Sequence, residues 1–239
     1  MKKSIKIIIT LIVIIIISII AMFVTKIIND LKQEENLVNE LNSLFALLEE
    51  DIFRYDEIDK KLSQTVTTGD YNTLEVSIKS YMSDIVSTIK KLESLGNDED
   101  LNNVLTIKNF ESDGPKFSKT TKILNKANKD LDDIYSKINA YFSEEGAMSY
   151  IENKGLDSYY IELYKEYMFE NDEINIINEK NEIIDNLDKI KEILDIEEKM
   201  IKYLITNKQN WRIEDDTLVF NSKKLSDTYN KYVDELSKK

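Results

Sequence analysis

The feature that most constrains this chain is an uncharged segment at its N-terminus. No charged residue occurs from Ile7 to Thr25, and three lysines precede that stretch. As a helix with a rise of about 1.5 Å per residue, residues 5–24 would extend roughly 30 Å, which is the thickness of the hydrocarbon core of a bilayer. We therefore predict that residues 5–25 form an N-terminal transmembrane helix.

The charges on either side of this segment predict its orientation. Lys2, Lys3 and Lys6 lie before it, whereas acidic residues dominate from Asp30 onward. Positively charged flanks stay in the cytoplasm, so the N-terminus is expected inside the cell membrane and the bulk of this single-pass protein outside it. The predicted division is an anchor with a short cytoplasmic tail at 1–28 and an extracytoplasmic domain at 29–239.

A cleaved secretory signal is the alternative interpretation of the same segment. Such signals usually carry an apolar region of about 7–15 residues, followed by a site of the small-x-small type. Here the apolar run is longer, and residues 18–22 (Ser-Ile-Ile-Ala-Met) offer no clear cleavage pattern. The length therefore favours an uncleaved anchor.

The composition favours helices over strands. The chain has only 5 glycines and 1 proline among 239 residues, and it is rich in the helix-forming residues Leu, Lys and Glu. We predict an all-α fold: the transmembrane helix, then an antiparallel bundle of four to six long helices, with one small β-hairpin near the C-terminus.

The absence of two residue types and the excess of acidic residues limit the classes of function that this chain can have. The chain contains no cysteine and no histidine, which removes disulfides, thiol nucleophiles, histidine bases and nearly all zinc sites. The net charge is −13, and all 45 acidic residues follow residue 29. Such a surface repels nucleic acid, although it would suit a basic peptide partner. A simple solvated acidic surface is the other interpretation.

Apolar residues at alternating three- and four-residue steps predict the first helices. Such a seam runs through residues 37–62, with Asp51 at its one polar position, so we expect an unbroken helix over 5–64. A second helix is expected at about 71–95. Gly96 then stands where a left-handed residue commonly ends a helix.

The same periodicity predicts helices in the rest of the chain. Glycine- and proline-containing stretches separate them, and the segment from Gly146 to Gly155 is expected to be a linker with one helical turn. The predicted helices are at about 98–110, 117–142, 157–207 with a kink near 171–175, and 223–236.

One pair of short strands interrupts this helical pattern. Trp211-x-Ile213 and Leu218-x-Phe220 alternate apolar and other residues on either side of Asp215-Asp216. That pattern is typical of a β-hairpin. Because an isolated hairpin is marginally stable in water, its aromatic residues are expected to pack on the end of the bundle.

This C-terminal stretch also carries a resemblance. From Asn207 to Phe220 it reads N-x3-W-x-I, then an acidic turn, then an apolar residue, x and Phe, followed by a final helix. It resembles C-terminal segments of uncharacterised single-pass or lipid-anchored helical proteins of low-GC Gram-positive bacteria. The resemblance implies an extracytoplasmic setting and no known activity. Those segments usually have glycine in the turn, where this chain has Asp215-Asp216.

Two groups of residues are candidates for binding. Tyr160, Tyr164 and Tyr167 share a predicted helix face, and tyrosines in clefts between helices can bind ligands, although at this spacing they more often fill a core. Residues 98–102 (Asp-x-Asp-x-Asn) have the spacing that opens a calcium loop. That loop needs glycine at its sixth position and glutamate at its twelfth, and this chain has Asn103 and Asn109 there. We therefore expect no metal site, and no cofactor.

The sequence favours a structural or interaction protein. It predicts a membrane-anchored bundle that docks an envelope partner or self-associates, because no catalytic group of residues stands out. The alternative is a ligand- or peptide-binding module, including an immunity protein against a secreted toxin. Enzymatic activity is not expected, because histidine and cysteine, the commonest general base and the strongest nucleophile, are both absent.

Overall fold

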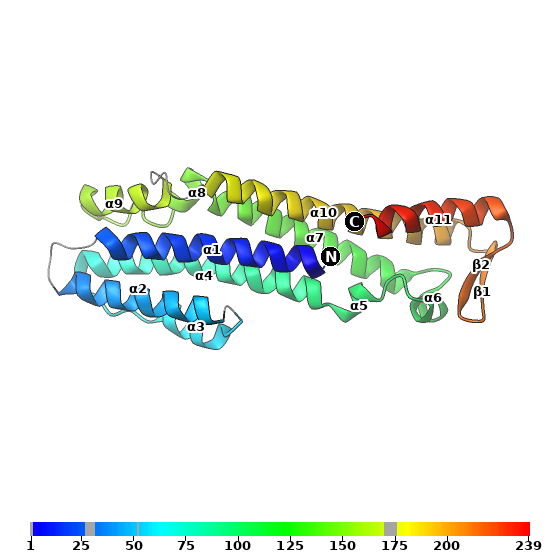
Figure 1. Cartoon of the computed structure of the whole chain (residues 1–239), viewed down its shortest axis with the longest axis horizontal. Helices are drawn as coiled ribbons and strands as arrows, with labels where there is room; N and C mark the ends of the chain where they lie inside the picture. The colour runs from blue at the N-terminus through cyan, green and yellow to red at the C-terminus, as the bar shows by residue number, and fades with distance from the viewer. Residues whose placement is uncertain (1, 27–31, 52, 170–175) are drawn as a thin grey trace. The chain divides into compact units, whose positions relative to one another are not determined.

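The computed structural model describes residues 2–26, 32–51, 53–169 and 176–239. These residues form a mostly helical, bundle-like fold with one small hairpin near the C-terminus (Figure 1), which confirms the predicted helical class. The elements in chain order are α1 Lys2–Lys26, α2 Gln33–Glu50, α3 Tyr55–Ser63, α4 Gly69–Asn97, α5 Glu99–Asn102, α6 Ile107–Asp113, α7 Ser118–Tyr141, α8 Glu144–Met148, α9 Ser158–Phe169, α10 Ile176–Thr206, β1 Trp211–Glu214, β2 Thr217–Phe220 and α11 Lys223–Ser237.

The chain packs as two compact units, and each is assembled from separate stretches of sequence. The first contains Met1–Lys6, Lys91–Tyr135 and Ile184–Lys239, and the second contains Ile7–Lys90 and Ser136–Ile183. The predicted boundary at residue 28 lies outside the described residues and stays a prediction.

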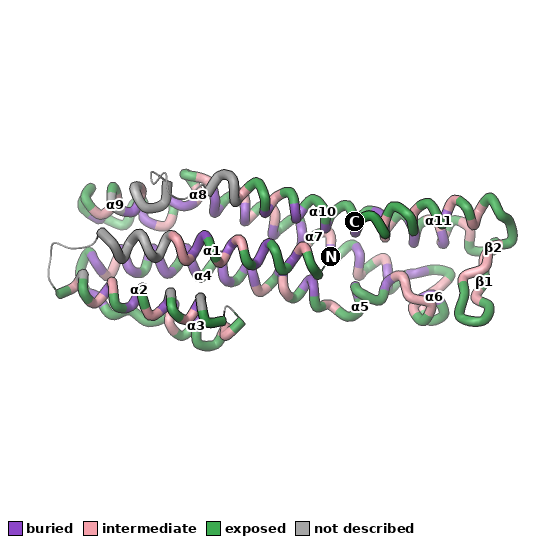
Figure 2. Tube along the Cα trace, viewed as in Figure 1, coloured by how far each residue is buried: buried purple, intermediate pink, exposed green. Residues whose placement is uncertain are grey.

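Each unit has an apolar core formed by one face of each long helix (Figure 2). Helix α4 covers the helix predicted at about 71–95 and buries one face of it, including Leu74, Ile78, Ile85 and Leu92. Helix α1 buries Ile8, Ile12, Ile15 and Ile16 completely. Within the part of the chain that the structure describes, no helix has the length and apolar character needed to cross a bilayer.

The predicted unbroken helix over residues 5–64 is wrong. Helix α2 ends at Glu50, and Asp51 is extended, with φ −164° and ψ 106°. The Asp51 Oδ1 accepts a hydrogen bond of 2.9 Å from the Phe53 N–H. Such side chain to backbone bonds compete with helix formation, so the one polar position in the seam is where the helix stops. Arg54 bridges the break through ion pairs with Glu50 and Glu57.

Gly96 does not end its helix in a left-handed conformation, as the sequence had suggested. Helix α4 continues to Asn97, and a Cβ atom at Gly96 would lie 2.9 Å from the Ile5 Cδ1. The glycine therefore gives room to a side chain of α1. The next predicted helix, at about 98–110, is split into α5 and α6, because Thr106 is extended and caps α6 by accepting a hydrogen bond from the Asn109 N–H.

The predicted hairpin is confirmed. Trp211 pairs with Phe220 in an antiparallel register. Asp215 and Asp216 have φ values of 48° and 55°, which is the left-handed pair of a type I′ turn and matches the twist of the strands. The Trp211 indole N–H donates a 2.8 Å hydrogen bond to the Leu204 carbonyl at the end of α10, so the hairpin packs on the first unit.

The last helices agree with the sequence in their main features. Helix α7 and helix α11 lie within a residue or two of their predicted bounds, and α8 supplies the short helix of the expected linker. The predicted kink near 171–175 lies outside the described residues.

One buried carboxyl group stands out in the first unit. The Oε2 atom of Glu197, on α10, is buried and has no hydrogen-bond partner among the described residues. Burial disfavours the charged form and raises the pKa of Glu197 from 4.5 to about 7.

This pKa predicts a loss of stability as the pH rises. Between pH 4.5 and about 7 the folded state holds a proton that the unfolded state has released, so the free energy of unfolding falls across that window, by on the order of 3 kcal/mol. Glu197→Gln cannot ionise and should lack this fall. Thermal unfolding of the full-length chain at pH 5 and pH 8 checks the difference.

Glu198→Gln is the matched control, because it removes the same charge at the next helical position. It should keep the pH dependence of the unsubstituted chain. If stability changed between pH 5 and pH 8 by the same amount in the Glu197→Gln variant and in the unsubstituted chain, the prediction would be wrong, because Glu197 would then not contribute to the pH dependence.

Candidate functional site

A buried lysine organises the second unit. The Lys79 side chain on α4 is only 2% exposed, and its Nζ lies 2.8 Å from the Glu40 Oε1 of α2 and 2.8 Å from the Glu75 Oε1. The third donor of the ammonium group goes to the Gln64 carbonyl oxygen, also at 2.8 Å. All three of its hydrogen-bonding positions are therefore satisfied inside the protein.

Glu75 extends this network to the connection between α3 and α4. Its Oε2 accepts hydrogen bonds from the Thr67 N–H at 3.0 Å, the Thr67 hydroxyl at 2.6 Å and the Val66 N–H at 3.1 Å. The residue is fully buried. These hydrogen bonds hold the backbone before α4 against the Glu75 side chain, so Glu75 fixes the path of this connection.

Glu40 completes the network from α2. Burial alone would raise its pKa, but hydrogen bonds and charge from Lys79 and Lys61 outweigh burial and hold the pKa below its usual value. The Lys61 Nζ lies 3.1 Å from the Glu40 Oε2. Because the pKa is lowered on folding, the stability that Glu40 contributes is present near neutral pH and is lost as the pH falls through the folded-state pKa.

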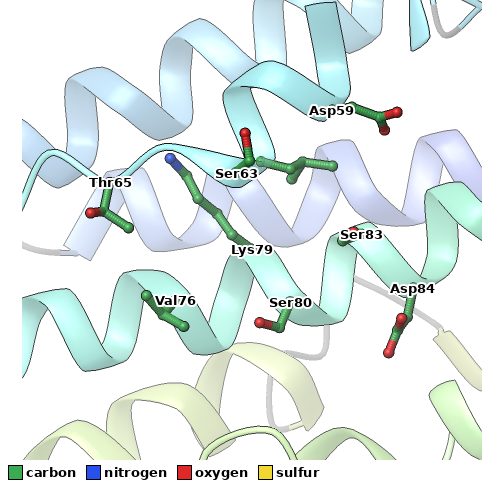
Figure 3. A pocket seen from close by; sticks show the side chains of 9 residues that line it. Asp59, Ser63, Thr65, Val76, Lys79, Ser80, Ser83 and Asp84 are labelled. Atoms are coloured by element: carbon green, nitrogen blue, oxygen red, sulfur yellow. The ribbon is translucent and has the colours of Figure 1, made fainter. Parts of the chain in front are cut away.

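Beside this network lies a hollow of about 510 Å³ between α3, α4 and their connection (Figure 3). We call it the α3–α4 hollow. Two carboxylates lie at one end of it, and Thr65 and Val76 lie at the other. Its lining residues are Asp59, Leu62, Ser63, Thr65, Val76, Lys79, Ser80, Ser83 and Asp84.

The two carboxylates of the hollow have different partners. The Asp59 Oδ2 lies 2.5 Å from the Lys90 Nζ, in a partly exposed ion pair. The Asp84 Oδ2 instead accepts a 2.6 Å hydrogen bond from the Tyr150 hydroxyl. Burial, together with this carboxylate, raises the pKa of Tyr150, so the phenol stays neutral and leaves the charge of Asp84 uncompensated.

A second hollow, of about 470 Å³, lies between α2 and α3. Its lining includes Arg54, Lys60 and Lys61 together with Glu50 and Glu57. Arg54 already pairs with both glutamates, at 2.6 Å and 2.5 Å. Both carboxylates of this hollow are thus paired within it, and Lys61 pairs with Glu40 outside it, which makes the hollow the weaker candidate.

Of the tyrosines that the sequence singled out, Tyr160 and Tyr164 line neither hollow. Tyr164 is fully buried, and its hydroxyl donates a 3.1 Å hydrogen bond to the Ala147 carbonyl oxygen. Tyr160 is partly exposed and meets the Tyr71 ring edge-on at 5.2 Å. Tyr167 lies in α9, and its side chain is outside the described residues. A ligand site at the three tyrosines stays a prediction.

The calcium-like segment has a structural role at a helix start. The Asp98 Oδ1 accepts a 2.9 Å hydrogen bond from the Leu101 N–H and so caps α5. Asp100 pairs with Lys119 at 2.9 Å. In the described parts of the chain, no group of three acidic side chains is arranged to hold a metal ion.

Comparison of the chain with protein-family models, with curated proteins and with solved structures finds no match.

The sequence analysis missed the network around Lys79. One signal was present, because Glu75 and Lys79 are four residues apart on either side of the buried Ile78, which places both at the edge of the predicted apolar face of α4. Charged residues at such positions usually extend into solvent, so the pattern alone does not identify them as buried.

The network predicts a large effect of one substitution. Lys79→Met keeps the volume of the side chain but leaves the Glu75 carboxylate buried without its cation, which typically costs about 3–5 kcal/mol. Lys61→Met is the matched control. Its partly exposed pair with Glu40 should contribute about 1 kcal/mol or less. Urea unfolding of the full-length variants measures both, and equal losses would show that Lys79 is not the centre of the network.

Proposed function

We propose that this chain is a membrane-anchored interaction protein, held in the cell membrane by α1 with its acidic helical part outside the cytoplasm. The alternative is a peptide-binding module with the same anchor, and the α3–α4 hollow favours it as the form that the interaction takes. No catalytic step is included in the proposal.

The observation that carries the anchor is the chemistry of the outward face of α1. Ile14 is 44% exposed and Ile7 is 36% exposed, at positions where the other long helices carry mostly charged residues. In the sequence the uncharged stretch continues to Thr25. A helix that is apolar on its outward face as well as its inward face is suited to lipid on all sides.

The inward face of α1 is compatible with the same proposal. Ile8, Ile12 and Ile15 are fully buried in the second unit, and lipid tails would shield them from water equally well, since lipid is as apolar as a leucine side chain. Entry into the bilayer would exchange one apolar environment for another. The lysines at positions 2, 3 and 6 would then remain on the cytoplasmic side.

The acidity of the chain supports the interaction part of the proposal. With a net charge of −13, the chain repels anionic lipid headgroups and nucleic acid, and attracts basic protein surfaces. Electrostatic attraction of this kind steers a partner and accelerates its association.

Cysteine labelling in intact cells tests the location directly, because the natural sequence has no cysteine. Ser237→Cys should react with a membrane-impermeant maleimide in intact cells, whereas Ser4→Cys should react only after lysis. Labelling of both positions only after lysis would contradict the proposed orientation. Loss of Ser4→Cys from the mature chain, read by intact mass spectrometry, would show a cleaved signal instead of an anchor.

A pair of double variants tests whether α1 is in lipid. Leu11→Asp/Ile14→Asp changes the outward face, and Ile12→Asp/Ile15→Asp changes the buried face. In a bilayer each aspartate near the helix centre costs about 2.5–3.5 kcal/mol, whichever face it is on. Both variants should therefore lose retention in carbonate-washed membranes to a similar extent. Normal retention of the outward pair, with unfolding of the inward pair alone, would place α1 in the bundle.

A further inference from the structure

The α3–α4 hollow presents negative charge and no available positive charge. Its one lysine, Lys79, has all three donors taken by Glu40, Glu75 and the Gln64 carbonyl oxygen. Lys79 is only 2% exposed, so it forms the floor of the hollow and offers a ligand little surface of its own. Among the lining residues, Val76, which is 41% exposed, supplies the accessible apolar surface, together with the edge of Leu62.

Hydrogen-bond acceptors surround this apolar surface. The hydroxyls of Thr65, Ser80 and Ser83 make no hydrogen bond among the described residues, and all three line the hollow. Together with the carboxylates of Asp59 and Asp84, they offer acceptors on both sides of the opening (Figure 3). Hydroxyls also donate, but only the carboxylates here carry charge that a ligand could neutralise.

We infer that the α3–α4 hollow binds the side chain of a lysine or arginine from a basic peptide segment of a partner protein. The methylene groups of such a side chain would lie on Val76 and the edge of Leu62, and its cationic end would reach Asp84. This inference depends on the proposed interaction function, for which it names the class of partner.

The chemistry of the lining argues against two other ligand classes. An anion would need a cation with free donors, and the only lysine among the lining residues is satisfied. A sugar ring is commonly stacked on an aromatic side chain, and no aromatic residue is among the lining residues. A flexible aliphatic cation fits the combination of apolar surface and carboxylate.

Lys90 occupies one of the two carboxylates of the hollow, so an incoming cation would compete with it for Asp59. Its Nζ pairs with Asp59 and also lies 4.9 Å from the centre of the Tyr55 ring. A lysine that is displaced from Asp59 would keep this cation–π contact. Asp84 has no cation among the described residues to displace, which makes it the stronger anchor for the ligand.

Fluorescence anisotropy of a labelled oligolysine peptide, with the full-length chain in neutral detergent micelles, tests this site. Asp59→Asn/Asp84→Asn should weaken binding by about fivefold or more at moderate salt. The fold should survive, since the amide oxygen that the second substitution introduces can still accept a hydrogen bond from the Tyr150 hydroxyl. Ser83→Trp, which fills the hollow without a change of charge, should weaken binding to a similar degree.

Two control variants separate a specific site from general acidity. Asp132→Asn/Asp133→Asn removes the same number of charges from α7, where both residues are paired with lysines, and Ser136→Trp adds the same bulk on an exposed surface of α7. Both should bind the peptide as the unsubstituted chain does. The inference would be overturned if the two double aspartate variants weakened peptide binding equally, or if Ser83→Trp left peptide binding unchanged. Because the assay is made in detergent, such a failure would leave the labelling result for the anchor unaffected.

Discussion

The burial of the Lys79 ammonium group is the constraint on which most of the second unit depends. A lysine at 2% exposure is tolerated only when its charge is paired and its donors are used. The three acceptors come from α2, from the residue after α3, and from α4 itself. Satisfying one side chain therefore sets the position of α2 relative to α4 and the path of the α3–α4 connection. The hollow beside that connection is a consequence of the same arrangement.

Helix α1 differs from the other long helices, because residues 7–18 carry no charge on either face. A bundle helix normally buries one stripe and exposes charge on the other, as α4 does with Lys90 and Lys91 at its surface. Helix α1 buries its isoleucines on one side and still exposes Ile7 and Ile14 on the other. This part of α1 therefore lacks the charged stripe that the other long helices present to solvent, and the proposed anchor is argued from that difference.

The parts of the fold that were predicted correctly are those with a local signal. The bounds of α7 follow from its periodic apolar residues, and the hairpin follows from alternation around Asp215-Asp216. The features that were predicted wrongly depend on side-chain hydrogen bonds or on contacts between helices, which have no local signal in the sequence. The end of α2 depends on an Asp51 side chain that bonds to the backbone, and Gly96, within α4, leaves room for the Ile5 side chain of α1, a contact that the local sequence does not reveal. The Lys79 network could not be predicted because a buried ion pair and an exposed one have the same sequence pattern.

The Lys79 network and the apolar faces of α1 involve different residues of the second unit. The contacts of the Lys79 network come from residues 40–79, and the polar contacts of the hollow involve Asp59, Asp84 and their partners Lys90 and Tyr150. None of these groups belongs to α1. Helices α2 and α3 are therefore attached to α4 by polar contacts in which the apolar residues of α1 take no part, and α1 contributes to the same unit through its buried isoleucines. The polar and the apolar contributions to this unit thus come from separate side chains, and a substitution in one set leaves the contacts of the other in place.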